Sequence, residues 1–255
     1  MALELPNHIR ESSLVDAEIK YTWKKPWQCK FEVPRLYNRI SPIYGRGLLA
    51  LSAGFAEWVF WLLNRHTDET IFFEFIEATW ASVIDRRYLN HISKRYGDFT
   101  EEYYNLGINP LNTSDFWNYK EDLCHSIRGP LFVSIHLLGE AVDLTVPSRQ
   151  DGATRAVYLS NLAEQIVGKA PEFKKWRKAV VERLIKYHAR EYDLDNWMGT
   201  PVPREVLDLK YDYKPEMANE LLSAFLEKLD PSKNRFLLTS EELIDIGFEG
   251  TPYTL

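Results

Sequence analysis

Two stretches of the chain are apolar over nearly their whole length, and they predict the central helices of the fold. The first covers residues 46–65, and the second runs from Leu131 to Leu144. A helix that is apolar on all sides is typical of the buried centre of a larger domain. The longest apolar run, Leu48 to Leu63, has 16 residues and contains Glu57. It is too short and too interrupted to cross a bilayer, so we expect a core helix.

Amphipathic helices are predicted around these two. Apolar positions at helical spacing follow Asp68 and continue weakly to Tyr96, where Gly97 offers a stop. Another helix is expected after the cap-like residues 112–114. Further helical periods cover residues 153–168, 171–187, 216–229 and 240–246. Together these segments far exceed the one-third helical content of an average protein, so the predicted fold class is all-α.

The first 45 residues follow a different pattern from the rest of the chain. Residues 1–45 lack a helical period and contain four prolines, which interrupt regular structure. We expect an irregular N-terminal arm that packs on the domain through Trp23, Trp27 and Phe31. One short strand is predicted near residues 28–33.

The remainder of the chain, residues 46–255, is expected to form a single multi-helix domain of stacked helical hairpins. Placing residues 47–49 on residues 130–132 also aligns Glu57 with Glu140. In each half, an apolar helix is then followed by amphipathic ones. This alignment suggests a weak two-fold internal repeat.

The charge balance is acidic, with 31 basic and 37 acidic side chains, a net charge of −6 and a sequence pI of about 5.6. An acidic surface repels the phosphates of nucleic acids, and it favours a basic protein partner. Cys29 and Cys124 are too few for a disulfide framework, which indicates reduced thiols in a cytoplasmic protein. No signal-peptide pattern, Walker A loop, Gly-x-Gly-x-x-Gly or Gly-x-Ser-x-Gly motif occurs, so we expect no cofactor and no membrane attachment.

Glu57 is a candidate for a functional carboxylate because it lies inside an apolar helix. A buried carboxylate needs a partner or an elevated pKa. The nearest basic pair is Arg86-Arg87, one helix later, where an antiparallel hairpin would return. We therefore predict a contact between Glu57 and Arg86 or Arg87. This contact would either lock two helices together or belong to a catalytic or ligand-binding site.

A second polar group lies on the second apolar helix. His136, Glu140 and Asp143 are spaced at i, i+4 and i+7, so they share one helix face. Such a face can supply metal ligands, but the spacing is not that of the zinc hydrolase motif His-Glu-x-x-His. No second histidine-rich segment accompanies it. We expect a hydrogen-bonded polar stripe and no metal.

The pattern Arg-x4-His occurs twice, at Arg86 with His91 and at Arg183 with His188. It resembles the active-site motif of the HEPN ribonucleases, another all-α family. The resemblance implies a composite Arg/His site that cleaves RNA. Neither arginine is followed by the Asn, Asp or His that the family usually has. Five residues apart on a helix, Arg and His are separated by about 140°, so they would meet only in a composite cleft.

The apolar helix with the sequence Gly54-Phe55-Ala56-Glu57-Trp58 is followed by Asp85-Arg86-Arg87-Tyr88. With the size of the chain and its helical hairpins, this part, residues 46–192, resembles the all-α immunity proteins of bacterial polymorphic-toxin systems. That resemblance implies a non-catalytic inhibitor that occludes the active site of a cognate toxin. The HEPN-like ribonuclease is the alternative. A ligand sensor with a cavity near Glu57 and His136 is a third class.

Overall fold

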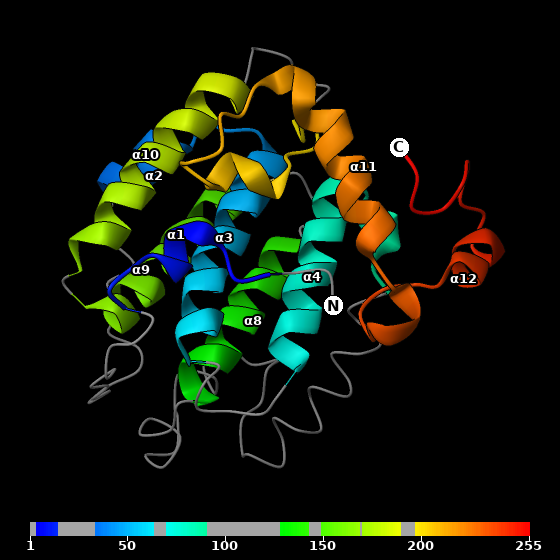
Figure 1. Cartoon of the computed structure of the whole chain (residues 1–255), viewed down its shortest axis with the longest axis horizontal. Helices are drawn as coiled ribbons and strands as arrows, with labels where there is room; N and C mark the ends of the chain where they lie inside the picture. Colours follow the sequence, from blue (N-terminus) through cyan, green and yellow to red (C-terminus); the bar gives the residue numbers. More distant parts are fainter. Residues whose placement is uncertain are drawn as a thin grey trace.

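The computed structural model describes residues 4–14, 34–63, 70–90, 128–142, 149–168, 170–189 and 197–255. Over these residues the chain is all-α, as the sequence predicts (Figure 1). Extended segments pair there only at two isolated bridges, Ile43 with Ala189 and Leu89 with Leu237. The helix expected after residues 112–114 lies outside the described residues.

Helix α3 (Gly45–Leu63) is the centre of the molecule. It packs against α4 (Ile71–Ile84), α8 (Arg128–Val142) and α9 (Arg149–Val167), and α8 also packs against α9 (Figure 1). Among the described residues, α3 is the one helix apolar enough for a membrane span, with mean hydropathy 1.3. Yet 89% of that stretch is buried inside the fold, which is the position of a core helix.

Helix α4 ends earlier than its sequence period suggests. The helical pattern was expected to continue to about residue 96, but α4 ends at Ile84 and Asp85 is extended, with φ −145° and ψ 121°. The Asp85 carboxylate accepts a hydrogen bond from the backbone N–H of Arg87 at 2.9 Å, so it caps a new turn, η2 (Arg86–Tyr88). A short polar side chain therefore competes with the helix and ends it.

An outer layer covers α3. Helix α10 (Pro171–His188) lies against α3, α2 (Pro34–Ile40) and the short turn η3 (Arg204–Leu207). At Gly54 of α3, a Cβ atom would lie 2.5 Å from the Leu207 side chain, so glycine is what lets η3 approach this closely. The chain continues through η4 (Pro215–Met217), α11 (Ala218–Lys228) and η5 (Pro231–Lys233) to α12 (Ser240–Asp245).

The N-terminal arm is more regular than the sequence indicates. It contains α1 (Asn7–Arg10) and α2, both inside the range expected to lack helices. Pro34 is the first residue of α2, a position where proline's missing N–H costs nothing. Ile9 and Ile40 are both 0% exposed, so these two helices are part of the core. The predicted strand near residues 28–33, with Trp23, Trp27 and Phe31, lies outside the described residues.

Candidate functional site

Glu57 forms a buried ion pair with Arg204 of η3. Oε1 of Glu57 accepts hydrogen bonds from Arg204 Nε at 2.7 Å and from Trp80 Nε1 at 2.9 Å. The Glu57 side chain is 1% exposed and that of Arg204 is 21% exposed. Arg204 Nη2 also donates to the backbone carbonyl of Glu4 at 2.8 Å. The guanidinium thus joins α3 to the N-terminal arm and to η3.

The prediction that Glu57 contacts Arg86 or Arg87 is therefore wrong. The side chain of Arg87 turns back onto Asp85, with Nη2 2.6 Å from Oδ2, and it is half exposed. Arg86 donates from Nη2 to the backbone carbonyl of Val142, at the end of α8. Because α4 ends at Ile84, both arginines lie on a separate turn. Oε1 of Glu57 is bonded from α4 and η3 instead, and Oε2 is buried without a hydrogen-bond partner among the described residues.

His8 of α1 lies beside this ion pair, although nothing in the sequence marked it. Its ring stacks on Trp176 at 4.6 Å between centroids and lies 5.6 Å from Trp58. Both ring nitrogens are buried without a hydrogen-bond partner. Burial lowers the pKa of His8 to about 3, with the nearby Arg204 charge acting in the same direction and Asp208 against it. His8 is thus a neutral aromatic packing residue at physiological pH.

The two residues of the second Arg-x4-His pattern have structural roles. Arg183 Nη1 donates to the carbonyls of Asp208 at 2.6 Å and Val206 at 3.3 Å, which ties α10 to the end of η3. His188 is 5% exposed and stacks on Tyr213. Burial lowers the pKa of His188 to about 4, so at neutral pH the ring is uncharged and supplies no imidazolium as a general acid. Neither side chain is placed for general acid–base chemistry.

The remaining predicted residues contribute less to a site. His91 and Asp143 lie outside the described residues, as do the side chains of His136 and Glu140 on α8. Within the described part of the chain, no three His, Cys, Asp or Glu side chains gather closely enough to hold a metal ion.

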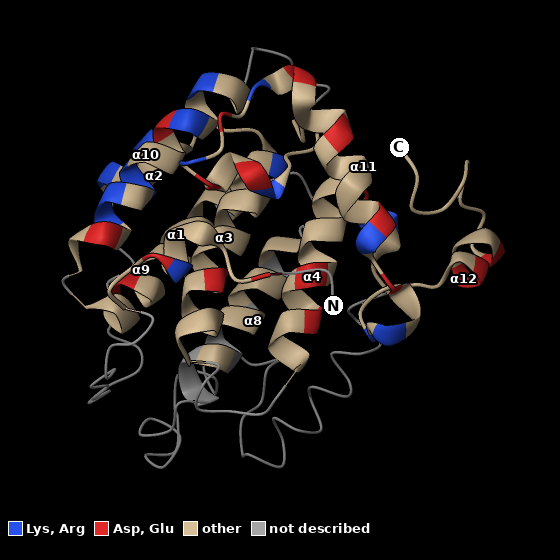
Figure 2. Cartoon of the chain, in the orientation of Figure 1, with Lys and Arg blue, Asp and Glu red and all other residues tan. Residues whose placement is uncertain are grey.

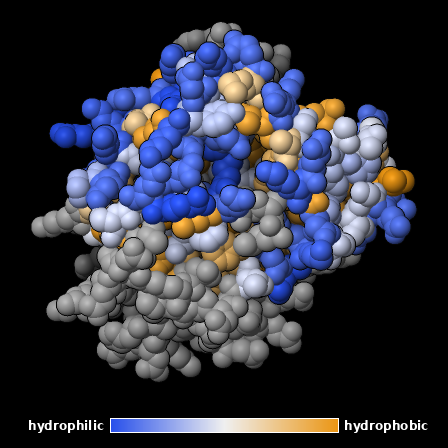
Figure 3. Space-filling model, in the orientation of Figure 1, coloured by the Kyte–Doolittle hydropathy of each residue, from blue (hydrophilic) through white to orange (hydrophobic). Residues whose placement is uncertain are grey.

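An exposed apolar and acidic surface lies at the C-terminal end of the chain. The large hydrophobic residues that are exposed among the described residues are Ile244, Ile246 and Leu255, at 62%, 61% and 53% exposure. The last 20 residues contain four carboxylates and no Lys, Arg or His. We call Ile244 and Ile246, with the exposed carboxylates Glu241, Asp245 and Glu249, the α12 surface. In Figure 3 an orange hydrophobic spot marks the outer side of this end of the molecule.

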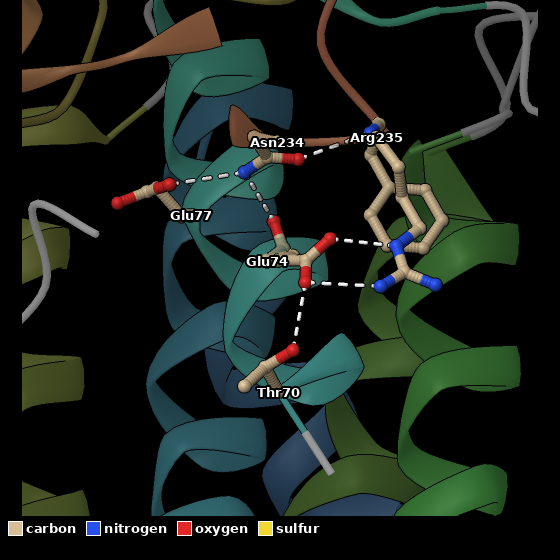
Figure 4. Close-up of polar contacts among 6 residues, drawn as sticks. Thr70, Glu74, Glu77, Asn234 and Arg235 are labelled. Carbon is tan, nitrogen blue, oxygen red and sulfur yellow. Dashed lines mark hydrogen bonds and ion pairs between the residues drawn. The ribbon is translucent and has the colours of Figure 1, made fainter. Parts of the chain in front are cut away.

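Polar contacts fasten the segment that leads to α12 onto helix α4 (Figure 4). Asn234 donates from Nδ2 to the Glu74 carbonyl at 2.8 Å and to Glu77 Oε2 at 3.0 Å. Its Oδ1 accepts the N–H of Phe236 at 3.0 Å. Arg235 then pairs with the Glu74 carboxylate, at 2.7 Å from Nε. Asn234 is 3% exposed, so its own hydrogen bonds form a buried anchor, whereas the Arg235 side chain is half exposed.

A second anchor follows directly. Leu238 donates its N–H to the Tyr88 carbonyl at 2.8 Å, and Asn90 donates to the Phe236 carbonyl at 3.0 Å. The Tyr88 ring also stacks on two aromatic rings of the C-terminal segment, with centroid distances of 4.4 Å to Tyr253 and 5.6 Å to Phe248. Helix α12 itself has a complete capping box, formed by Thr239 and Glu242. These contacts fasten the segments on both sides of the α12 surface to the fold.

Charge is unevenly distributed over the molecule (Figure 2). The carboxylates of α12 lie at one end, whereas lysines and arginines gather on α10 and α2 at the other. Arg39 of α2 pairs with Glu182 of α10 at 2.7 Å, and Lys175, Lys178 and Lys186 are exposed on the same helix. The acidic α12 end therefore favours the approach of positive charge, and the basic α10 end opposes it.

Comparison of the chain with protein-family models, with curated proteins and with solved structures finds no match. The assignment of a function therefore depends on the geometry of the chain itself.

Proposed function

We propose that this chain is a non-catalytic protein that binds and neutralises a basic cognate toxin, as the immunity proteins that it resembles do. The observation that carries the proposal is the α12 surface. Ile244 and Ile246 are each more than half exposed beside carboxylates, and a protein contact that buried them would be stabilised by the removal of their apolar surface from water. The anchors on α4 and Tyr88 keep this surface preformed, which lowers the entropy lost on binding.

The chemistry of the α12 surface supports a basic protein as the proposed partner. Glu241, Asp245 and Glu249 would attract a positively charged protein and speed its association. Ile244 and Ile246 would then enter apolar pockets of the partner and slow dissociation. A nuclease with a basic substrate groove has this combination of charge and concavity. Covering such a groove would inhibit the toxin without any chemical step.

The alternative function, a HEPN-like ribonuclease, has less support. Arg183 is bound to backbone carbonyls, and buried His188 has a pKa lowered to about 4. Arg86 holds the end of α8. These side chains fix the fold, whereas a catalytic histidine needs access to the substrate and a pKa near the working pH.

The proposal is tested in cells that express the protein encoded next to this chain. Wild-type chain should restore growth when that neighbour is toxic. The double variant Ile244→Asp/Ile246→Asp should not, although both positions are exposed and the fold should survive. The matched control is Asp212→Lys/Glu216→Lys, two exposed carboxylates at the opposite end of α11. Equal protection by both variants, or none by the wild type, would contradict the proposal.

A further inference from the structure

A cavity of about 190 Å³ lies between α4, α11 and residues 202–205. Its apolar walls include Trp80 and Ile84 of α4 and Leu222 and Phe225 of α11. Trp80, Ile84 and Leu222 are 2%, 5% and 4% exposed, so the core holds the walls in place. Hydrophobic residues are visible among hydrophilic ones along α11 in Figure 3. The cavity is therefore preformed, with an apolar wall on one side and charged residues on the other.

Four charged side chains line the same cavity. Arg204 and Lys228 supply two positive charges, and Glu4 and Glu205 supply two carboxylates. A ligand with a single charge would meet repulsion from one of these pairs. A ligand with one charge of each sign would instead find a partner for both. Arg204 is also paired with Glu57, so a net charge of zero is not what selects the ligand. Because the lining presents groups of both signs, it suits a ligand that carries one charge of each sign.

Arg204 and Glu205 each have polar atoms that remain available to a ligand. Glu57 and the Glu4 carbonyl fix the Arg204 guanidinium through Nε and Nη2, and Nη1 has no hydrogen-bond partner among the described residues. Beyond its own backbone N–H, Glu205 has no hydrogen-bond partner in the described ranges. Burial raises the pKa of Glu205, with the Arg204 and Lys228 charges opposing. The cavity thus offers an oriented cation and a carboxyl group that lacks a direct ion-pair partner.

We propose that this cavity binds a small zwitterion with an apolar side chain, which is the chemistry of a free hydrophobic amino acid. The ligand carboxylate lies against Arg204 Nη1, with Lys228 nearby. The ligand ammonium pairs with Glu205. The ligand's apolar side chain fills the space beside Trp80 and Phe225. The cavity volume of about 190 Å³ suits one leucine or phenylalanine molecule. No residue of α12 lines the cavity, so this proposal does not depend on partner binding.

The test titrates L-phenylalanine into the full-length chain at pH 7 and follows the backbone amide and tryptophan indole NMR signals. N-acetylphenylalanine and phenylalaninamide each remove one ligand charge, and L-serine removes the apolar side chain. We expect saturable shifts at Trp80 and α11 with phenylalanine, and binding at least tenfold weaker for the other three compounds. Glu205→Gln should weaken phenylalanine binding at least tenfold, whereas Glu220→Gln, on α11 but outside the cavity, should leave it unchanged.

The ligand series uses the wild-type chain, so its outcome does not depend on whether a variant folds. The phenylalanine concentration is raised to 10-fold above the concentration that saturates a site with a Kd of about 1 mM. If no NMR signal shifts at that concentration, the proposal is wrong. Equal binding of phenylalanine and either one-charge analogue would also overturn it, as would an unchanged affinity in a folded Glu205→Gln variant. Lys228→Met provides a second variant on the carboxylate side and should also weaken binding.

Discussion

Arg204 donates a hydrogen bond from Nε to Oε1 of Glu57 over 2.7 Å, and the two residues are 147 positions apart in the chain. Glu57 lies in the central helix α3, whereas Arg204 begins a short turn in a segment rich in proline and glycine. The pair therefore connects the core of the bundle to its outer layer. It also fixes the guanidinium that lines the α11 cavity.

Removal of the Glu57 carboxylate should be costly. Glu57→Ala leaves the Arg204 charge and the Trp80 indole N–H without their acceptor. Breaking a buried pair costs about 3–5 kcal/mol, and we expect the lower end because Arg204 is 21% exposed and can reach water. The free energy of unfolding from urea titration measures this loss. The control is Glu182→Ala, which breaks the exposed Arg39–Glu182 ion pair, also 2.7 Å long. It should lower the free energy of unfolding by less than about 1 kcal/mol. Similar values for the two variants would contradict this account.

Stability should fall as the pH is lowered from about 6.5 towards 5. Burial lowers the pKa of His8 to about 3 and that of His188 to about 4, whereas in the unfolded chain both titrate near 6.5. In this window the unfolded chain binds more protons, so each histidine removes up to about 1.4 kcal/mol of stability per pH unit.

The variant His8→Phe isolates one of these contributions. Phenylalanine keeps the contact with Trp176 and removes two buried nitrogens that lack hydrogen bonds. Its free energy of unfolding should equal or exceed that of the wild type at pH 7, and should exceed it clearly at pH 5. An unchanged pH slope in His8→Phe would show that this ring is solvated or already protonated.

The anchor at Asn234 should control the order of the C-terminal segment. Asn234→Asp removes both donated bonds and places a carboxylate beside Glu77, which should cost about 1–3 kcal/mol or more. Hydrogen exchange at the Leu238 amide, which bonds to the Tyr88 carbonyl, should accelerate. Arg235→Ala is the control, because its guanidinium is half exposed and its ion pair contributes little. Equal protection of Leu238 in both variants would mean that Asn234 is not the anchor.

Purified chain should not cleave RNA, with or without divalent metal. The reason is that Arg183 is bound to backbone carbonyls and His188 is buried and neutral. His188→Ala should lower the melting temperature and leave the absence of cleavage unchanged. Cleavage of mixed RNA by the wild type that is lost in both Arg183→Ala and His188→Ala would restore the ribonuclease alternative.

The sequence predicts the fold class because α3 and the helices around it carry strong apolar periods. It also predicts the limits of α10 and α12 closely, since Pro171 marks the start of α10 and α12 lies within the expected range 240–246. It fails at α4, where the apolar period continues in the sequence past Ile84 but Asp85 caps a new turn. Short polar side chains decide such boundaries locally.

The candidate site could be predicted only in part. Glu57 stands out because its neighbours are apolar, but its partner Arg204 lies in a segment without period, so no spacing relates the two residues. His8 belongs to an arm that shows no helical pattern, and its burial arises from the packing of α1 on Trp176. The α12 surface is visible only once burial is known, because Ile244 and Leu243 look alike in sequence although Leu243 is 0% exposed.

The most direct test of the proposed function is the affinity of the purified chain for the protein encoded beside it, measured by surface plasmon resonance. We predict that Ile244→Asp/Ile246→Asp raises Kd at least 100-fold, mainly through faster dissociation, as expected for central apolar contacts. Glu241→Lys/Asp245→Lys should instead slow association about tenfold at low salt and lose this effect at high salt. Asp212→Lys/Glu216→Lys should bind like the wild type. Binding that none of the α12 variants weakens, or no binding by the wild type, would contradict the account.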